Sequence, residues 1–445
     1  MASFSSSRMK RWFPILILLL LALTVRLLWL QHNLYNQGRF YGYSVTSAMI
    51  GEAYKETNKV GVVDTELAQR YAQVRNETGR LIDPEEFGGR VELKNIKPQY
   101  DIEIGLGMLM GMIWKLTGHS RFVYVQLLQI LIDVICVLLL YLAVHWLFKD
   151  RRFALFAVLL YALFPYQIDL VTFPAPYVWP VFLVVTITFL LAYITKRKRL
   201  CEVVGVFLLA GVSIGLVAMI RSTVVLLGVF IGLLSLVWNP YLSDKRRIWL
   251  LVAIIAGQAL VMLPLVLHNK ATFGAPFPTR GTFWHTVYTG FGAHDNPWGI
   301  RNDDQATIER VKRAYPNISY ATPEYENVLK KWSLRIIFSH PLWYAGVLIS
   351  RAALFVLPDP SAKTSWPIVG LVMLGIIGAY RVIASGHFSK ADKLAVFYAL
   401  SLPSVHFPIF IIPIYIPERV YVQASYVALL TLSVAAFRSP GTKTA

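Results

Sequence analysis

The sequence predicts an all-α polytopic membrane protein, with about ten transmembrane helices and two large loops on the outer face of the membrane. Three observations carry this prediction. Hydrophobic residues make up 56% of the 445 residues and charged residues only 15%, which excludes an ordinary soluble domain. Apolar runs close to the roughly 20 residues that cross a bilayer recur along the chain. The short connectors at 149–152, 196–199 and 244–247 are basic, whereas the long polar stretches fall on the opposite side.

The first apolar run follows Arg8, Lys10 and Arg11. We interpret it as an uncleaved membrane helix over about 13–31, because it is long and no small-residue cleavage site follows it. The basic residues before it predict a cytoplasmic N-terminus, so the chain from residue 32 lies on the outer face.

Two outer loops, 32–120 and 268–360, belong to a single predicted transmembrane domain that covers 1–445. The first loop ends in a short juxtamembrane helix over 101–117, which is expected to lie at the membrane interface. In the second loop, polar residues 303–337 have helical spacing, and 340–357 is expected to be interfacial or re-entrant. With this choice the C-terminus is cytoplasmic. The remaining spans are expected at about 121–147, 153–166, 174–195, 201–220, 222–238, 248–267, 366–384, 391–413 and 419–437.

Several classes of function are excluded by motif and charge. The chain has no P-loop, so an ATP-driven pump is excluded for this chain alone, and it has no GxSxG, HExxH or CxxC motif. The net charge of +18 lies largely in short loops and at the termini, so we interpret it as membrane orientation and expect no nucleic acid. No metal ligands and no organic cofactor are predicted, and participation of a divalent metal stays open.

Three carboxylates of the first loop are candidates for a general base. Asp101 and Glu103 precede an apolar helix at interface depth, where partial desolvation raises the pKa of a carboxyl group and a lipid-linked substrate is within reach. Their alternative role is that of helix N-terminal charges favoured by the macrodipole. Glu52 is the third candidate.

Cationic side chains near the outer boundary are candidates for binding a phosphate. Arg221, Arg280 and Arg419 are expected there, where a guanidinium can hold a phosphate in bidentate fashion. Their alternative role is interfacial snorkelling. His268 completes this predicted phosphate-binding set.

Aromatic and amide side chains of the second loop suit a sugar. The candidates for sugar or acceptor binding are Asn269, Trp284, His285 and Asn296, although aromatic residues are common at any membrane interface. Inside the second membrane helix, Asp133 shares a face with Gln129. An intramembrane Asp marks either a functional site or an interhelical hydrogen bond.

An ordered set of short motifs is spread over most of the length of the chain: Arg26, then 97–101, 105–118, 125–142, 211–221, 264–276, 339–341 and 417–419. Together they resemble the GT-C superfamily of polytopic glycosyltransferases, in particular the bacterial protein-mannosyltransferase-like and aminoarabinose-transferase-like enzymes. The resemblance implies a polyprenyl-phosphate sugar donor on the outer face and a catalytic carboxylate in the first loop. Two features depart from the family pattern. The acidic residue that the family usually has soon after its first helix is missing from 38–47. His268 stands where Arg is common in the family.

We therefore expect an inverting glycosyltransferase of the bacterial inner membrane, with periplasmic or extracellular loops. It would move a sugar from polyprenyl phosphate to a hydroxyl of a glycan, lipid or protein acceptor. A transporter or flippase for a lipid-linked sugar is the alternative, and a non-catalytic scaffold is a third. A transporter should carry intramembrane charges along its whole path, whereas this chain has few in the inner half apart from Asp133.

Overall fold

The structure is a computed structural model, and it describes residues 6–33, 41–79, 81–87, 93–194, 199–237 and 244–356, together with 377 and 380. Apart from these last two residues, the three C-terminal helices predicted at 366–384, 391–413 and 419–437 lie outside the described residues. Arg419, a predicted phosphate ligand, lies outside them as well.

The membrane part of the described chain consists of apolar helices: α1 (Ser6–Asn33), α5 (Phe122–Phe148), α6 (Arg151–Ala162), α7 (Pro165–Val171), α8 (Val178–Ile194), α9 (Leu200–Ile220), α10 (Leu227–Val237) and α11 (Asp244–Phe273). Among the described residues, α1, α5, α9 and α11 are long and apolar enough to cross a membrane, and two further apolar helices are shorter. A total of about ten spans therefore stays a prediction.

The helical hairpin predicted at 153–166 and 174–195 has different boundaries in the structure. Helix α6 ends at Ala162, and Pro165 begins the separate short helix α7. Proline fits the first position of a helix because its fixed φ is helical and no N–H is needed there, whereas in a helix interior it breaks the hydrogen-bond ladder. The residues that follow α7 form turns, so α8 begins only at Val178.

The segment predicted as the first outer loop is folded rather than irregular. It contains α2 (Tyr41–Thr57), α3 (Thr65–Thr78), the 3₁₀ turn η1 (Pro84–Phe87) and α4 (Gly105–Thr117). A two-stranded antiparallel ribbon, β1 (Val62–Asp64) with β2 (Ile96–Pro98), corrects the all-α prediction. Its strands have three residues each, too few for an alternating pattern to be recognised in the sequence.

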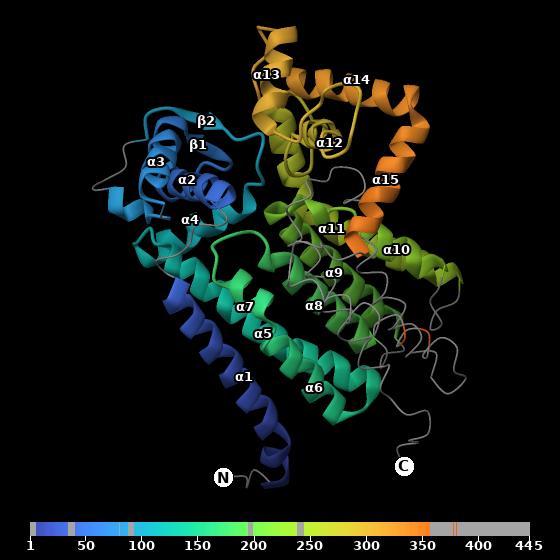
Figure 1. The fold of residues 1–445 in the computed structure, drawn as a ribbon. Helices are drawn as coiled ribbons and strands as arrows, with labels where there is room; N and C mark the ends of the chain where they lie inside the picture. Colours follow the sequence, from blue (N-terminus) through green and yellow to red (C-terminus); the bar gives the residue numbers. More distant parts are fainter. Residues whose placement is uncertain are drawn as a thin grey trace.

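The second outer loop contains α12 (Phe283–Phe291), α13 (Asp304–Ala314), α14 (Pro323–Ser339) and α15 (Pro341–Val356). The helical character predicted for 303–337 is confirmed, with a break between α13 and α14. Each of these two helices has a side-chain N-cap, since Asp303 accepts from the N–H of Ala306 and Thr322 from that of Tyr325. Figure 1 shows both loop units at the end of the helical bundle that lies opposite the N-terminus.

Close helix contacts in the membrane part depend on glycine. A Cβ atom on Gly211 of α9 would lie 2.1 Å from the carbonyl oxygen of Ile254 on α11, and one on Gly257 would lie 2.2 Å from that of Leu208. Small residues let two apolar helices approach at backbone distance. The two glycines thus pack α9 directly against α11, the helix that leads into the second loop.

A fully buried ion pair connects the N-terminal helices. Arg26 of α1 donates to the carboxylate of Asp133 on α5 and to the carbonyl oxygen of Ala162 at 2.9 Å. Tyr161 and Gln167 donate to the other oxygen of Asp133. The interpretation of Asp133 as an interhelical hydrogen-bonding residue is therefore confirmed, and its partners come from α1, α6 and α7.

Candidate active site

The segment just before α4 runs along the beginning of the second loop. The N–H of Gly281 donates to the carbonyl oxygen of Tyr100 at 2.8 Å, and the Thr282 hydroxyl donates to that of Asp101 at 3.2 Å. The Tyr100 ring packs edge-on against Phe273 and Phe277, with centroid distances of 5.1 and 5.0 Å. These contacts join chain segments about 180 residues apart and place the polar groups of both loops together.

Glu103 lies at the centre of this junction and is only 2% exposed. One carboxylate oxygen accepts from the backbone N–H of Ser222 at 3.0 Å and from its hydroxyl, and it lies 3.8 Å from Nε of Arg280. Burial alone would raise the pKa of Glu103, but the charges of Arg280 and Arg221 and the Ser222 hydrogen bonds lower it overall. Glu103 is thus a charged carboxylate that pairs with Arg280 and is stabilised by the charge of Arg221.

Asp101 is half-buried and differs from Glu103 in its electrostatics. Burial raises its pKa, and this outweighs its hydrogen bonds, including one from Tyr320, and the charges of Arg280 and His285. The Gln99 amide also donates to it. A carboxylate with a raised pKa beside cationic groups combines the basicity and the surroundings that a general base needs.

His285 connects α12 to the next two helices. Its Nε2 lies 3.1 Å from a carboxylate oxygen of Asp304, and its Nδ1 lies 2.7 Å from the hydroxyl of Tyr325. Because a carboxylate only accepts, Nε2 carries a proton. The hydrogen bond from His285 holds the pKa of Asp304 below its usual value. This arrangement fixes the imidazole, which is 5% exposed, beside Asp101.

Glu326 of α14 closes the N-terminus of α12. Its two oxygens accept from the backbone N–H groups of Trp284 at 2.6 Å and of His285 at 3.1 Å. These groups have no partner inside their own helix, and a carboxylate is favoured there by the macrodipole. Burial nevertheless raises the pKa of Glu326 to about 7. Glu326 therefore titrates near neutral pH while it positions the start of α12.

Replacing Glu326 with Gln is expected to remove a pH dependence of stability. A folded-state pKa of about 7 exceeds the ordinary glutamate pKa of 4.5, so the folded state binds this proton more tightly than the unfolded state. The stabilisation is complete below pH 4.5 and is lost as the pH rises through about 7. With about 1.4 kcal/mol for each pKa unit, the loss is at most about 3.5 kcal/mol. Unfolding of the purified protein in detergent at pH 5 and pH 8 measures it.

The control for this prediction is Glu324→Gln, two residues earlier on α14, because Glu324 is exposed. This variant should keep the pH dependence of the unchanged protein. If Glu326→Gln and the unchanged protein lose the same stability between the two pH values, the titration belongs to another group.

The remaining predicted site residues lie away from this junction. Glu52 of α2 is buried beside Ser120 and Lys55, at the far end of α4. Since α4 has 13 residues, it spans about 20 Å. The structure therefore does not bring Glu52 to Asp101 or Glu103.

Three predicted ligands of the second loop have other surroundings. His268 and Asn269 lie on α11, which continues to Phe273; His268 is exposed, and the Asn269 amide donates to the carbonyl oxygen of Phe277 at 2.9 Å. Asn296 makes hydrogen bonds within its own loop, including one from the N–H of Ile300 at 2.9 Å. The two amides thus stabilise loop geometry.

Arg221, Arg280 and His285 do meet at the junction, and Trp284 precedes His285 at the start of α12, where its backbone N–H donates to Glu326. Arg221 is 3% exposed and lies 5.4 Å above the ring of Tyr177. Sequence reasoning missed four residues of the junction: Asp304, Tyr320, Tyr325 and Glu326. Asp304 stands in the first turn of α13, and Tyr325 and Glu326 stand in that of α14, where the local pattern is that of ordinary helix starts. Within the described ranges, no group of three or more His, Cys, Asp or Glu side chains is arranged to hold a metal ion.

The described helices form the fold of a polytopic membrane protein, and part of the chain is similar to a known glycosyltransferase family. The family model for dolichyl-phosphate-mannose-protein mannosyltransferase matches residues 104–268. This segment begins beside Glu103 and contains Arg221. The resemblance to GT-C membrane glycosyltransferases that the motifs indicated is confirmed.

Solved structures of similar fold are oligosaccharyltransferases of Archaeoglobus fulgidus. One is the archaeal enzyme AglB in complex with an inhibitory peptide and a dolichol-phosphate, with a TM-score of 0.54 and 13% identity over 96% of this chain and 50% of that one. Another carries a tethered acceptor peptide with the NVT sequon, with a TM-score of 0.54 and 13% identity over 96% of this chain and 49% of that one. At this identity the likeness is one of fold, and the chain spans about half the length of these proteins. No curated protein matches the chain.

Proposed function

We propose that the protein is an inverting glycosyltransferase that moves a sugar from a polyprenyl-phosphate donor to an acceptor hydroxyl. One observation carries the proposal. A half-buried carboxylate with a raised pKa, Asp101, lies in the same junction as Arg221 and Arg280, which share the buried carboxylate of Glu103. The dolichol-phosphate in one structure of similar fold supports a lipid-phosphate donor.

The reaction needs a general base on the acceptor side of the anomeric carbon and an anion site on the side of the departing phosphate. Asp101 accepts the proton of the acceptor hydroxyl, and the acceptor oxygen then attacks the anomeric carbon of the sugar. The bond between that carbon and the phosphate oxygen breaks, and the electron pair leaves with the lipid phosphate. A single displacement inverts the anomeric centre and requires no covalent intermediate.

Arg280 and Arg221 are suited to stabilise the phosphate as its charge develops. Arg280 has a side chain that is 21% exposed, and its 3.8 Å separation from Glu103 is longer than a hydrogen bond. Glu103 thus keeps the guanidinium of Arg280 at the junction, where its partly exposed side chain can meet an incoming anion. Preorganised cations of this kind lower the barrier because they need no reorientation during the reaction.

His285 and Trp284 are proposed to border the acceptor side of the junction. Burial raises the pKa of Asp101, and the charge of the His285 imidazole partly opposes this rise. Hydrogen bonds with Asp304 and Tyr325 hold the ring in place. We further propose that both loops face the periplasm or cell exterior of a bacterial inner membrane, with cytoplasmic termini. The basic connectors between the apolar helices support this orientation.

Proteoliposomes test the proposal. Undecaprenyl phosphate carrying radiolabelled glucose, galactose or mannose is supplied on the loop side, and release of undecaprenyl phosphate is measured with membrane glycans as acceptors. Arg280→Ala should raise the KM for the donor at least tenfold, and Arg280→Lys should restore part of the loss. The control is Arg301→Ala, an exposed arginine of the same loop. Movement of intact donor across the bilayer without sugar release would instead identify a transporter.

A further inference from the structure

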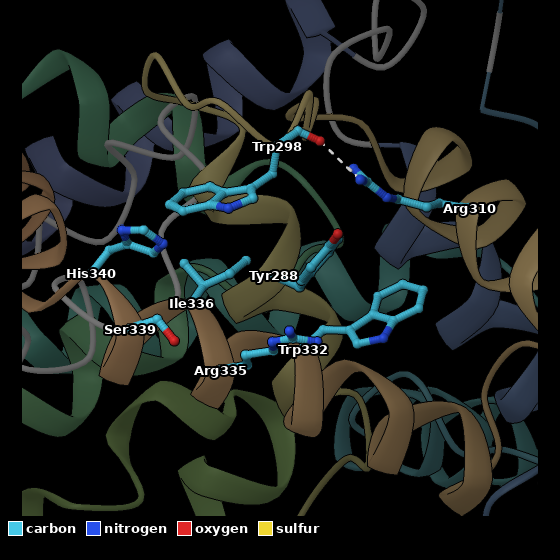
Figure 2. Close-up of a pocket in the computed structure, with 8 residues that line it drawn as sticks. All are labelled: Tyr288, Trp298, Arg310, Trp332, Arg335, Ile336, Ser339 and His340. Atoms are coloured by element: carbon cyan, nitrogen blue, oxygen red, sulfur yellow. Dashed lines mark hydrogen bonds between the residues drawn. The ribbon is translucent and has the colours of Figure 1, made fainter.

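A cavity lies within the second outer loop, and none of its lining residues belongs to the junction described above. Its volume is about 480 Å³, and it lies between α12, α13, α14 and the segment that joins α12 to α13. Six side chains define its chemistry: Tyr288, Trp298, Arg310, Trp332, Arg335 and His340. Figure 2 shows Trp298 and His340 on one side of this groove and Trp332 with Arg310 on the other. We call it the Trp–Arg groove.

The walls of the Trp–Arg groove are held by contacts of their own. Arg310 donates to the backbone carbonyl of Trp298 at 2.8 Å and lies 6.0 Å above the ring of Tyr288. The Trp298 ring packs edge-on against Trp343 at 4.8 Å and is tilted against His340 at 5.1 Å. The groove is therefore preorganised, and little ordering would be needed for a ligand to bind.

The lining of the groove selects a ligand by chemistry. Aromatic rings of Trp and Tyr present apolar faces, whereas Arg310 and the exposed Arg335 present positive charge. Among the described residues that line the groove there is no carboxylate. Arginine forks match carboxylate and phosphate groups in geometry. A molecule with an apolar ring face and a negative group complements both features.

We propose that the Trp–Arg groove binds an anionic saccharide, with a sugar ring on the tryptophans and its carboxylate or phosphate on Arg310 and Arg335. The inference rests on the proposed function, because it identifies this saccharide as part of the acceptor glycan. Tyr325 of α14 contacts His285 of the junction. Trp332, which lines the groove, lies seven residues after Tyr325 on the same helix. At 1.5 Å per residue this is about 10 Å. A glycan held in the groove thus reaches the candidate active site.

Isothermal titration of the full-length protein in detergent, without donor, tests the groove directly. The probes are trigalacturonic acid, its neutral methyl ester and glucose 1-phosphate. We expect trigalacturonic acid or glucose 1-phosphate, but not the ester, to bind, and the stronger of the two identifies the anionic group. Arg335→Ala should raise the Kd for that probe at least tenfold. The matched control is Lys331→Ala, an exposed cation of the same helix that does not line the groove.

Each other outcome overturns the inference. If the ester binds as well as the acid, the arginines do not recognise charge. If Lys331→Ala weakens binding as much as Arg335→Ala, the saccharide only senses the overall positive charge of the protein. Absence of binding by all three probes rejects the groove as a site for anionic saccharides. Because titration needs no turnover, binding that depends on Arg335 in a protein without transferase activity would reject the proposed function and leave the groove assigned.

Discussion

Replacing Asp101 with Asn is expected to lower the turnover number of sugar transfer by about 10²–10⁴-fold, the usual contribution of a general base. The amide keeps the size of the side chain but cannot accept the proton of the acceptor hydroxyl. Arg221 and Arg280 are unchanged, so the KM for the lipid donor should stay within about threefold of its original value. Steady-state kinetics with the radiolabelled donor separates the two quantities.

Two further variants decide between the predicted bases. Glu52→Gln should retain turnover, because Glu52 lies beside Ser120 and Lys55 at the far end of α4. Glu103→Gln should raise the KM for the donor, since Glu103 pairs with Arg280 and is stabilised by the charge of Arg221. Glu85→Gln serves as a surface control, because Glu85 pairs with Arg121. Full turnover after Asp101 and Glu103 are both changed to Ala would remove the carboxylate mechanism altogether.

The pH profile gives an independent readout of the same residue. Burial raises the pKa of Asp101 above the ordinary aspartate value of 3.8. A base must be deprotonated to act, so the rate should fall with decreasing pH at a higher pH than an ordinary Asp would cause. This acidic limb should be absent from the residual activity of Asp101→Asn. A profile of the same shape in both proteins would assign the limb to another group.

The sequence predicts the membrane helices well because a bilayer imposes length, apolarity and loop charge on each segment separately. Helices α5 and α9 accordingly lie within two residues of their predicted ranges. The boundary at Ala162 was missed because a proline can bend a helix or begin a new one, and the choice depends on neighbouring helices. The ribbon of β1 and β2 was missed because its partner strands are short and more than 30 residues apart.

The candidate site was predictable as a set of residue types but not as an arrangement. The sequence predicts two residues near the outer membrane boundary, Glu103 as a candidate general base and Arg280 as a phosphate ligand. The structure pairs their side chains. Their meeting depends on the Tyr100–Gly281 hydrogen bond, a contact between distant segments that leaves no local pattern. Glu326 likewise has the local signature of a helix start, and only its burial against α12 raises its pKa.

Breaking the buried pair of Arg26 and Asp133 is expected to destabilise the protein by about 3–5 kcal/mol. Both side chains are fully buried in the membrane part, and Asp133→Asn would leave the guanidinium without its counter-charge. The double variant Arg26→Met with Asp133→Leu removes both charges and should recover most of the loss, since a buried ion pair and well-packed apolar residues are often similar in stability. Reversible denaturation in detergent or lipid bicelles measures these differences.

The control for this pair is Asp169→Asn. Asp169 of α7 accepts from the indole N–H of Trp29 of α1 at 3.2 Å, and Trp29 is exposed. This hydrogen bond joins α1 to α7 without a buried charge. Its loss should lower the free energy of unfolding by less than about 1 kcal/mol. A similar loss in both single variants would mean that the region responds to any disturbed contact rather than to an unpaired charge.

The double variant also decides whether the buried pair only holds the helices together or acts on the substrate. A transported headgroup would need Asp133 to exchange partners along its path, whereas Arg26, Tyr161 and Gln167 already donate to both of its oxygens. If the pair only holds α1 against α5, α6 and α7, the double variant should transfer sugar at close to the original rate once it is folded. If it folds stably but neither releases nor moves the donor, Asp133 acts on the substrate, and the buried pair is part of the function rather than of the scaffold.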